Sequence, residues 1–254
     1  MRHVKVLAAA LISLAATQLP AASVPAFLAA AVADPARPTV DTERDQNRKP
    51  AETLEFAGIA PGQQVAEILP GGGYFTRIMS KAVGTGGHIY ALVPAPSPND
   101  PPNTPDFAAR VKALAADSNY QNVTVVSEPF AQLKTPAKVD LVWTSQNYHD
   151  LHNFPGLDVA VFNQLVFEAL KPGGIYLILD HATEPGAGVT ETSTLHRIDP
   201  DTVKREVLAA GFVFVGSSDI LRQPSDPHTA KVFDPSIRGR TDQFILKFKK
   251  PGRS

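Results

Sequence analysis

The chain contains no cysteine among its 254 residues. This absence excludes disulfide bonds, thiolate metal ligands, a cysteine nucleophile and a lipid anchor attached through cysteine. An excess of charge is also lacking, because 24 basic and 25 acidic residues leave a formal net charge of −1. Nucleic acid is therefore not expected as a partner, since phosphate binding requires a basic surface.

No apolar run at the N-terminus is long enough to span a bilayer comfortably. Arg2 and Lys5 precede a short apolar stretch, residues 6–16, and Ala31-Val32-Ala33 fits the small-residue rule for signal peptidase. We therefore expect residues 1–33 to be a leader that is cut after Ala33. The mature protein would then be periplasmic or secreted, without a stable membrane anchor, and an uncleaved anchor helix is the alternative.

The remaining chain is expected to contain a short arm and one domain. Residues 34–58 are polar at first and then predict a helix that begins at Pro50 and ends at Gly58. Residues 59–254 have ordinary globular composition and a length suited to one large domain.

Apolar runs and helical periodicity alternate along this domain. The predicted strands are 64–69, 88–93, 123–127, 139–144, 175–180, 212–217 and 243–248. The predicted helices are 74–83, 107–116, 157–170 and 200–210. Regular alternation predicts a parallel sheet with helices on both faces. No helix separates the last two strands, so the seventh strand must run antiparallel.

A glycine-rich turn, Gly71-Gly72-Gly73, follows the first strand and precedes the first helix of the domain. Glycines at such a point let a backbone approach a ligand closely and expose amides at the helix N-terminus. A tight turn without any ligand is the alternative reading.

Several motifs resemble those of the class I S-adenosylmethionine-dependent methyltransferases. They are Val65-Ala66-Glu67 with the glycine turn, Gly87-His88-Ile89-Tyr90-Ala91, and Leu170-Lys171-Pro172-Gly173-Gly174. The chain is most similar to a group of predicted secreted bacterial methyltransferases. That similarity rests on Pro50-Ala51-Glu52-Thr53-Leu54, Pro70-Gly71-Gly72-Gly73-Tyr74, Leu195-His196-Arg197-Ile198-Asp199, Val232-Phe233-Asp234-Pro235 and Gly239-Arg240-Thr241-Asp242-Gln243-Phe244.

The resemblance covers nearly the whole mature chain and implies a fold, a cofactor and a reaction. The implied fold is α/β, a doubly wound Rossmann-like sheet of seven strands with the last strand antiparallel. The implied function is transfer of a methyl group from S-adenosylmethionine to a small molecule. The resemblance assigns the cofactor to residues at strand ends: Glu67, Gly71, Gly72, Gly73, Glu128 and Gln146.

Two positions depart from the cofactor pattern of the resembled enzymes. Leu69 stands where a glycine is usual, and Val93 stands where an acidic residue usually holds the ribose hydroxyls. Each charge-assisted hydrogen bond to a carboxylate is worth about 1.5–3 kcal/mol, so the missing carboxylate should weaken binding by about tenfold or more.

Catalytic candidates follow the fourth and fifth strands, where the resemblance places the substrate. His149 is the proposed base, and Asp180, His181 and His196 are expected to line the substrate side. Packing of His149 against the next helix is the alternative for that residue. The same side chains could also bind a metal, but their spacing along the sequence is not specific enough to identify metal ligands.

Two other functions stay open beside methyl transfer. One is a non-catalytic ligand-binding protein built on this fold, and the other is a metal-assisted hydrolase or lyase that uses the histidine and aspartate cluster. The sequence indicates neither the acceptor nor the oligomeric state.

Overall fold

The computed structural model describes residues 24–96 and 106–252. The charged start and apolar stretch of the expected leader lie outside these residues, as do residues 97–105 between the second predicted strand and the next predicted helix. Within the described ranges, no helix has the length and apolarity needed to cross a membrane.

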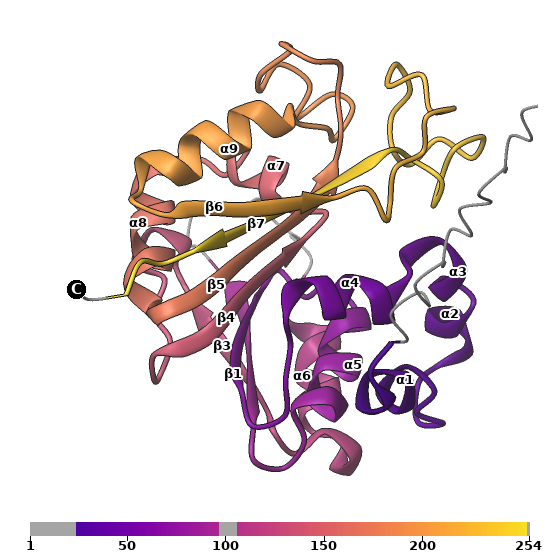
Figure 1. The fold of residues 1–254 in the computed structure, drawn as a ribbon, viewed down its shortest axis with the longest axis vertical. Coiled ribbons are helices and arrows are strands. Elements are labelled where there is room, and N and C mark those ends of the chain that lie inside the picture. Colours follow the sequence, from indigo (N-terminus) through magenta and orange to yellow (C-terminus); the bar gives the residue numbers. More distant parts are fainter. Residues whose placement is uncertain (1–23, 97–105, 253–254) are drawn as a thin grey trace, which may run out of the picture.

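A seven-stranded sheet forms the centre of the molecule, with strand order β3-β2-β1-β4-β5-β7-β6 (Figure 1). The strands are β1 (Gln64–Ile68), β2 (His88–Pro94), β3 (Val123–Glu128), β4 (Val139–Ser145), β5 (Leu170–His181), β6 (Val213–Ser218) and β7 (Gln243–Lys249). Only β7 runs antiparallel among them, pairing with β5 and β6. The predicted class I methyltransferase fold is therefore confirmed.

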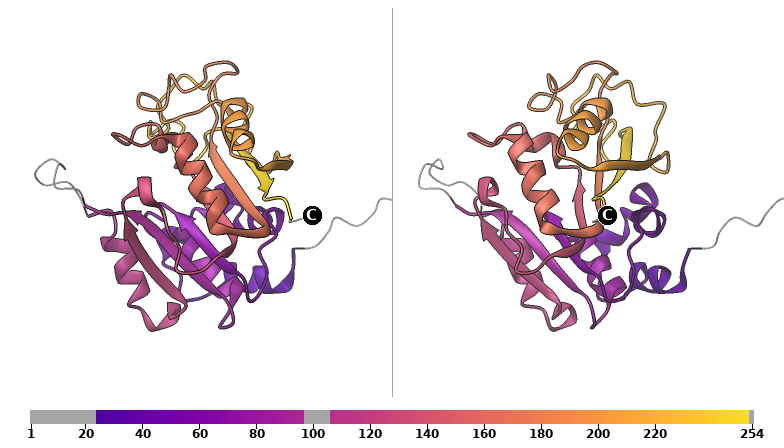
Figure 2. Two further views of the ribbon diagram at one scale, coloured as in Figure 1. Left: turned by 90° about the vertical axis from the view of Figure 1, so that its left-hand side faces the viewer. Right: turned by 60° about the vertical axis from the view of Figure 1, so that its left-hand side comes forward.

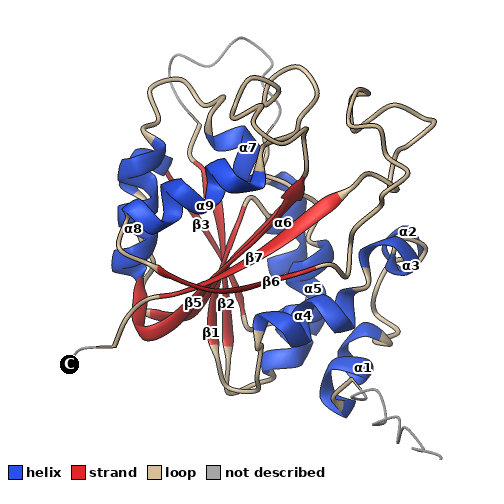
Figure 3. Ribbon diagram, turned by 45° about the horizontal axis from the view of Figure 1, so that its top comes forward, coloured by secondary structure: helices blue, strands red, loops and turns tan. Residues whose placement is uncertain are grey.

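Helices cover both faces of the sheet, as the views in Figures 2 and 3 show. One face carries α1 (Ala26–Val32), α4 (Pro50–Ala57), α5 (Tyr74–Val83) and α6 (Ala109–Ala115); the other carries α7 (Tyr148–Leu151), α8 (Val159–Ala169) and α9 (Pro200–Ala209). Each face has its own apolar core, one around Trp143 and Ile78 and the other around Phe162 and Phe248.

The signals for helix ends act as the sequence predicts. Pro50 occupies the first turn of α4, and Gly58 ends that helix with a φ of 82°. Asp199 begins α9, where its side chain accepts a hydrogen bond from the amide of Asp201. These local signals work because they satisfy backbone groups that the helix itself leaves unpaired.

In the predicted helix 157–170, Val161, Leu165, Phe167 and Leu170 recur at helical spacing, which favours them as the buried side. Within α8, the fully buried apolar side chains are instead Phe162 and Val166, and Val161 is 49% exposed. Apolar side chains lie on nearly every side of this helix, so periodicity alone does not fix the buried side.

An N-terminal segment packs against α4 and α5 before the first strand. It comprises α1 and two single turns, α2 (Thr39–Thr42) and α3 (Asp45–Arg48). Leu28 in α1 is fully buried in the core beside α5, and the Arg37 side chain is buried in an ion pair with Asp45 at 2.7 Å. A cut after Ala33 would remove α1 and expose this part of the core.

Candidate functional site

The carboxyl ends of β1, β2 and β4 lie level at one edge of the sheet. Ile68 pairs with Leu92 and with Thr144, so the loops after these strands begin side by side. Ligands bind at such an edge in doubly wound sheets. The arm and the β6–β7 connection lie at the same edge (Figure 1).

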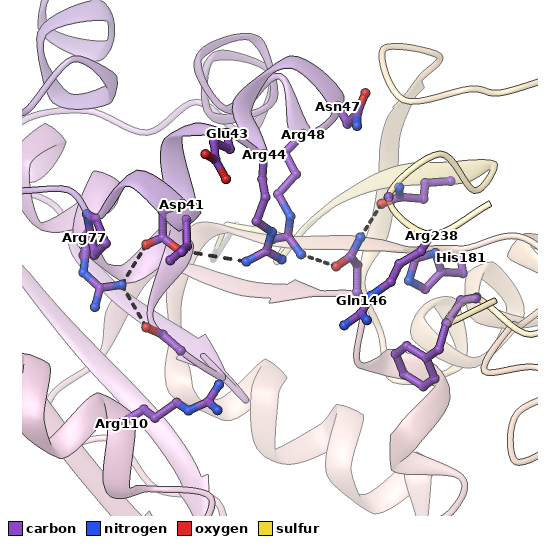
Figure 4. A pocket seen from close by; sticks show the side chains of 17 residues that line it. Asp41, Glu43, Arg44, Asn47, Arg48, Arg77, Arg110, Gln146, His181 and Arg238 are labelled. Carbon is purple, nitrogen blue, oxygen red and sulfur yellow. Dashed lines mark hydrogen bonds and ion pairs between the residues drawn. The ribbon is translucent and has the colours of Figure 1, made fainter. Parts of the chain in front are cut away.

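Three neighbouring cavities run along this edge. The central cavity, of about 310 Å³, contains Glu67, Gln146, His149, His181 and His196 in its wall. The apolar cavity, of about 370 Å³, is lined by Leu69, Gly71, Val93, Pro94, Phe107, Asn147, Asp150, Asn153 and Phe154. The arginine cavity, of about 880 Å³, contains Arg44, Arg48, Arg77, Arg110 and Arg238 in its wall (Figure 4).

Glu67 is a buried carboxylic acid beneath the central cavity. Its Oε2 accepts a hydrogen bond from the Thr76 hydroxyl at 2.5 Å. Burial raises the pKa of Glu67 to about 7, against the hydrogen bond from Thr76 and the charges of Arg48 and Arg77. A cation that enters the cavity would favour the ionised form of this side chain.

The glycines of the turn after β1 have different roles. Gly71 has a φ of 58°, and a Cβ added there would meet nothing within 4 Å, so the bare backbone faces the cavities that it lines. Gly72 lines the central and arginine cavities. Gly73 caps α5 with a φ of 83° and lines none of the three cavities, so a side chain at this position would be strained.

Asp180 organises the polar side of the site from the end of β5. Its buried carboxylate accepts hydrogen bonds from the backbone amides of His149 and His181, both at 2.7 Å. His149 Nδ1 lies 2.8 Å from the same carboxylate. Burial raises the pKa of Asp180, but the charge and hydrogen bonds of His149 outweigh burial and hold the pKa below its usual range.

His149 lies between two carboxylates. Its Nε2 is 3.3 Å from Asp150 Oδ1, on the side opposite Asp180. Burial lowers the pKa of His149, but the charges and hydrogen bonds of Asp180 and Asp150 outweigh it and raise the pKa to about 10. The two carboxylates therefore favour the protonated form of His149, the residue that the sequence proposes as the base.

The other two candidate histidines also reach the central cavity. His181 Nδ1 lies 2.8 Å from the Thr241 hydroxyl, and burial lowers the pKa of His181 to about 3 despite the charge of Asp180. His196 Nδ1 lies 3.3 Å from His149 Nε2, and the His196 ring packs on Phe233. The predicted convergence of these side chains is therefore present in the structure.

Strained backbone also gathers here. The described non-glycine residues with positive φ are Lys49, Leu69, Gln146, His196 and His228, and three of them line the central cavity. Left-handed backbone costs about 1–2 kcal/mol for a residue with a side chain, and such strain concentrates at functional sites. Leu69, at 52°, keeps the left-handed φ that the expected glycine would adopt readily.

Two groups of residues differ from the sequence expectations for the site. Glu128 is exposed at the end of β3 and lines none of the three cavities. Asp150, Arg44 and Arg48 do line them and were not predicted. The arginines come from the arm, whose alternating charges indicate a solvated segment when the sequence is considered alone.

Arg48 connects distant parts of the chain. Its guanidinium donates to the side-chain oxygen of Gln146, whose amide in turn donates to Gln243 at 2.9 Å (Figure 4). The Arg48 guanidinium also lies over the Tyr74 ring, 4.6 Å from its centroid. Burial lowers the pKa of Arg48 to about 10, so the side chain stays charged at neutral pH.

Comparisons with known proteins agree on the fold. No protein-family model matches the chain, and no curated protein matches it. A SAM-dependent methyltransferase from Aquifex aeolicus shares 16% identity and a TM-score of 0.58, over 82% of this chain and 92% of that one. The glycopeptide N-methyltransferase MtfA with bound S-adenosylmethionine shares 19% identity and a TM-score of 0.54, over 80% and 87%. The [4+2]-cyclase SpnF shares 15% identity and a TM-score of 0.57, over 82% of this chain and 81% of that one. These similarities establish the class I methyltransferase fold.

Proposed function

We propose that this protein transfers the methyl group of S-adenosylmethionine to a small, negatively charged acceptor outside the cytoplasm. The observation that carries the proposal is the position of the bare Gly71 turn. It lies between an apolar cavity and a polar one, at the sheet edge where this fold binds ligands.

The residues around this turn fit the cofactor. Phe107, Phe154 and Pro94 give the apolar cavity surfaces on which an adenine ring can pack. Glu67 lies under the central cavity, where its carboxylate would hold the positively charged amino acid end of the cofactor. When bound, the cofactor supplies an electrophilic methyl group on a sulfonium, and the protein must align an acceptor with it.

The two departures from the usual pattern change how the cofactor would be held. Val93 is buried in the wall of the apolar cavity, so no carboxylate lies at that position. Asn147 and Asn153 line the same cavity, and their side-chain oxygens would accept hydrogen bonds from the ribose hydroxyls. Leu69 preserves the backbone conformation of the turn but adds a side chain to the wall.

The arginine cavity supports a negatively charged acceptor. Its wall contains five arginines but only two carboxylates, Asp41 and Glu43. Asp41 pairs with Arg77 at 2.9 Å, whereas Arg238 makes no ion pair within the described residues. Arginine favours carboxylate and phosphate groups because its planar fork donates two parallel hydrogen bonds.

Inorganic phosphate is a direct probe of this acceptor site. We expect phosphate to raise the melting temperature of the wild type, and Arg238→Gln to reduce that shift at equal phosphate concentration. Arg205→Gln, which changes an arginine on α9 away from the cavities, is the matched control. Equal phosphate shifts in both variants would remove the support for an anionic acceptor.

The proposed location rests on the leader-like N-terminus. Because α1 belongs to the folded core, we place the start of the mature protein before Ala26 instead of after Ala33. Mass spectrometry of the N-terminal peptide from exported protein tests this directly. A mature chain that starts at Asp34 would contradict the placement.

Calorimetric titration with S-adenosylmethionine and S-adenosylhomocysteine tests the function. We expect micromolar binding that Glu67→Ala abolishes, while Glu168→Gln, on the exposed side of α8, leaves binding unchanged. No heat and no thermal shift at millimolar ligand would refute the methyltransferase proposal. A ligand-binding protein on this fold, which Leu69 and Val93 favour as the second candidate, would then remain.

A further inference from the structure

Three potential ligand atoms converge at the wall of the central cavity. His149 Nε2 lies 3.3 Å from His196 Nδ1 and 3.3 Å from Asp150 Oδ1. His196 Nδ1 lies 3.6 Å from the same Asp150 oxygen. The three atoms therefore form a nearly equilateral triangle made of two imidazole nitrogens and one carboxylate oxygen.

The size of this triangle matches one face of a tetrahedron around a small metal ion. Zinc binds nitrogen at about 2.0–2.1 Å and carboxylate oxygen at about 2.0–2.2 Å, which gives ligand-to-ligand distances of about 3.3–3.6 Å in a tetrahedron. An octahedral ion with similar bonds would need ligands about 3 Å apart. The observed distances favour the tetrahedral ion.

The surroundings of His149 provide a second, independent observation. Its Nδ1 faces the buried carboxylate of Asp180, which is itself held by two backbone amides. Metal-binding histidines typically donate their other ring nitrogen to such a carboxylate, which fixes the ring and directs the free nitrogen at the metal. The side chains of His149 and Asp180 are 3% and 0% exposed, so this orientation is set by the core.

We propose that His149, Asp150 and His196 bind one Zn²⁺ ion, with Asp180 as the positioning residue behind His149. The cluster lines the central cavity, and the Asp150 and His196 side chains are 34% and 24% exposed. An open fourth coordination position would therefore be reached from the cavity. Three protein ligands and one open position are typical of catalytic zinc sites.

The open position indicates the chemistry of its occupant. An oxygen donor on a small molecule, or a water, would complete the tetrahedron, and the ion would make its hydroxyl more acidic. The part of this inference that gives the ion a role with the acceptor rests on the proposed methyl transfer. The metal site itself is independent of the proposed methyl transfer, because it depends only on the three ligands and Asp180.

Metal binding can be measured on untagged protein without any cofactor. We expect one Zn²⁺ per chain in competition with a chromophoric chelator, and Co²⁺ in its place should give the intense visible absorption of a tetrahedral site. Asp180→Asn should weaken binding by roughly 10- to 100-fold, and loss of a ligand by more than that.

The variants are chosen to keep the fold. His196→Asn removes the imidazole and retains a residue that tolerates the positive φ at this position. Asp150→Asn provides a second ligand variant with an almost unchanged shape. His88→Ala, at the opposite end of the sheet, is the matched control and should bind zinc like the wild type.

Two outcomes would overturn the metal site. One is the absence of stoichiometric Zn²⁺ and of tetrahedral Co²⁺ absorption in folded wild type, which would leave His149 as a cation between two carboxylates. The other is unchanged zinc affinity in both His196→Asn and Asp150→Asn. S-adenosylmethionine titration in the presence of a chelator separates this result from failure of the proposed function.

Discussion

The buried Glu67 predicts a specific dependence of stability on pH. Burial raises the pKa of this carboxyl from 4.5 to about 7 in the folded protein. In the unfolded chain the side chain is in water and ionises near 4.5. Between these values the folded state binds more protons than the unfolded state, so stability falls as the pH rises.

The magnitude follows from the size of the shift. Each unit of pKa corresponds to 1.36 kcal/mol, so a shift from 4.5 to about 7 corresponds to about 3 kcal/mol. This stability is fully present below pH 4.5 and is lost by the time the pH has passed 7. Glu67→Gln cannot ionise, yet it keeps an oxygen that accepts the Thr76 hydrogen bond, so it should not lose this stability.

Urea unfolding of the wild type and Glu67→Gln between pH 4.5 and 8 measures the effect. The difference between their unfolding free energies should grow by about 3 kcal/mol across this range, because only the wild type loses the Glu67 contribution. Glu168→Gln, on an exposed surface, should follow the wild type at every pH. A constant difference between wild type and Glu67→Gln would refute the reasoning, because it would mean that Glu67 ionises alike in both states.

Three further predictions concern residues elsewhere in the fold. Leu28→Ala should lower the unfolding free energy by about 2–5 kcal/mol in urea titrations, because the side chain is fully buried in the core; a loss near zero would contradict the packing of α1. Arg197→Ala should cost about 3–5 kcal/mol by the same measurement, since Asp226 would remain buried without its partner; an effect below 1 kcal/mol would show that the pair is not buried in solution. Leu69→Gly should tighten S-adenosylmethionine binding in calorimetry by about tenfold, or 1.4 kcal/mol, because it removes a side chain from the cavity wall; weaker binding would mean that Leu69 contacts the cofactor.

The sequence was sufficient for the sheet because its signals are local. Apolar runs and glycine turns place β1 and α5 within a residue of their observed bounds, and the missing crossover before β7 correctly predicts its direction. The motifs also place Glu67 and His149 at one edge, since parallel strands end together. These inferences need only the order of elements along the chain.

Features that depend on distant contacts could not be predicted in the same way. Asp150 follows His149 directly, yet only the folded structure shows His149 held between Asp150 and Asp180. Arg48 belongs to a segment whose charges are those of a solvated arm, and its contact with Gln146 spans 98 positions of the chain. Leu28 resembles part of an export leader because buried helices and leaders are both apolar.

The contacts of Gln146 also affect how the protein acquires its site during synthesis. Gln146 is bound on one side by Arg48 from the arm and on the other by Gln243, the first residue of β7. A growing chain therefore contains the glycine turn after β1 long before it contains the last partner of Gln146. The arginine cavity, whose wall includes Gln243, is completed only when the final strand is inserted between β5 and β6, so partly synthesised or C-terminally clipped chains should lack this cavity even where most of the sheet has formed.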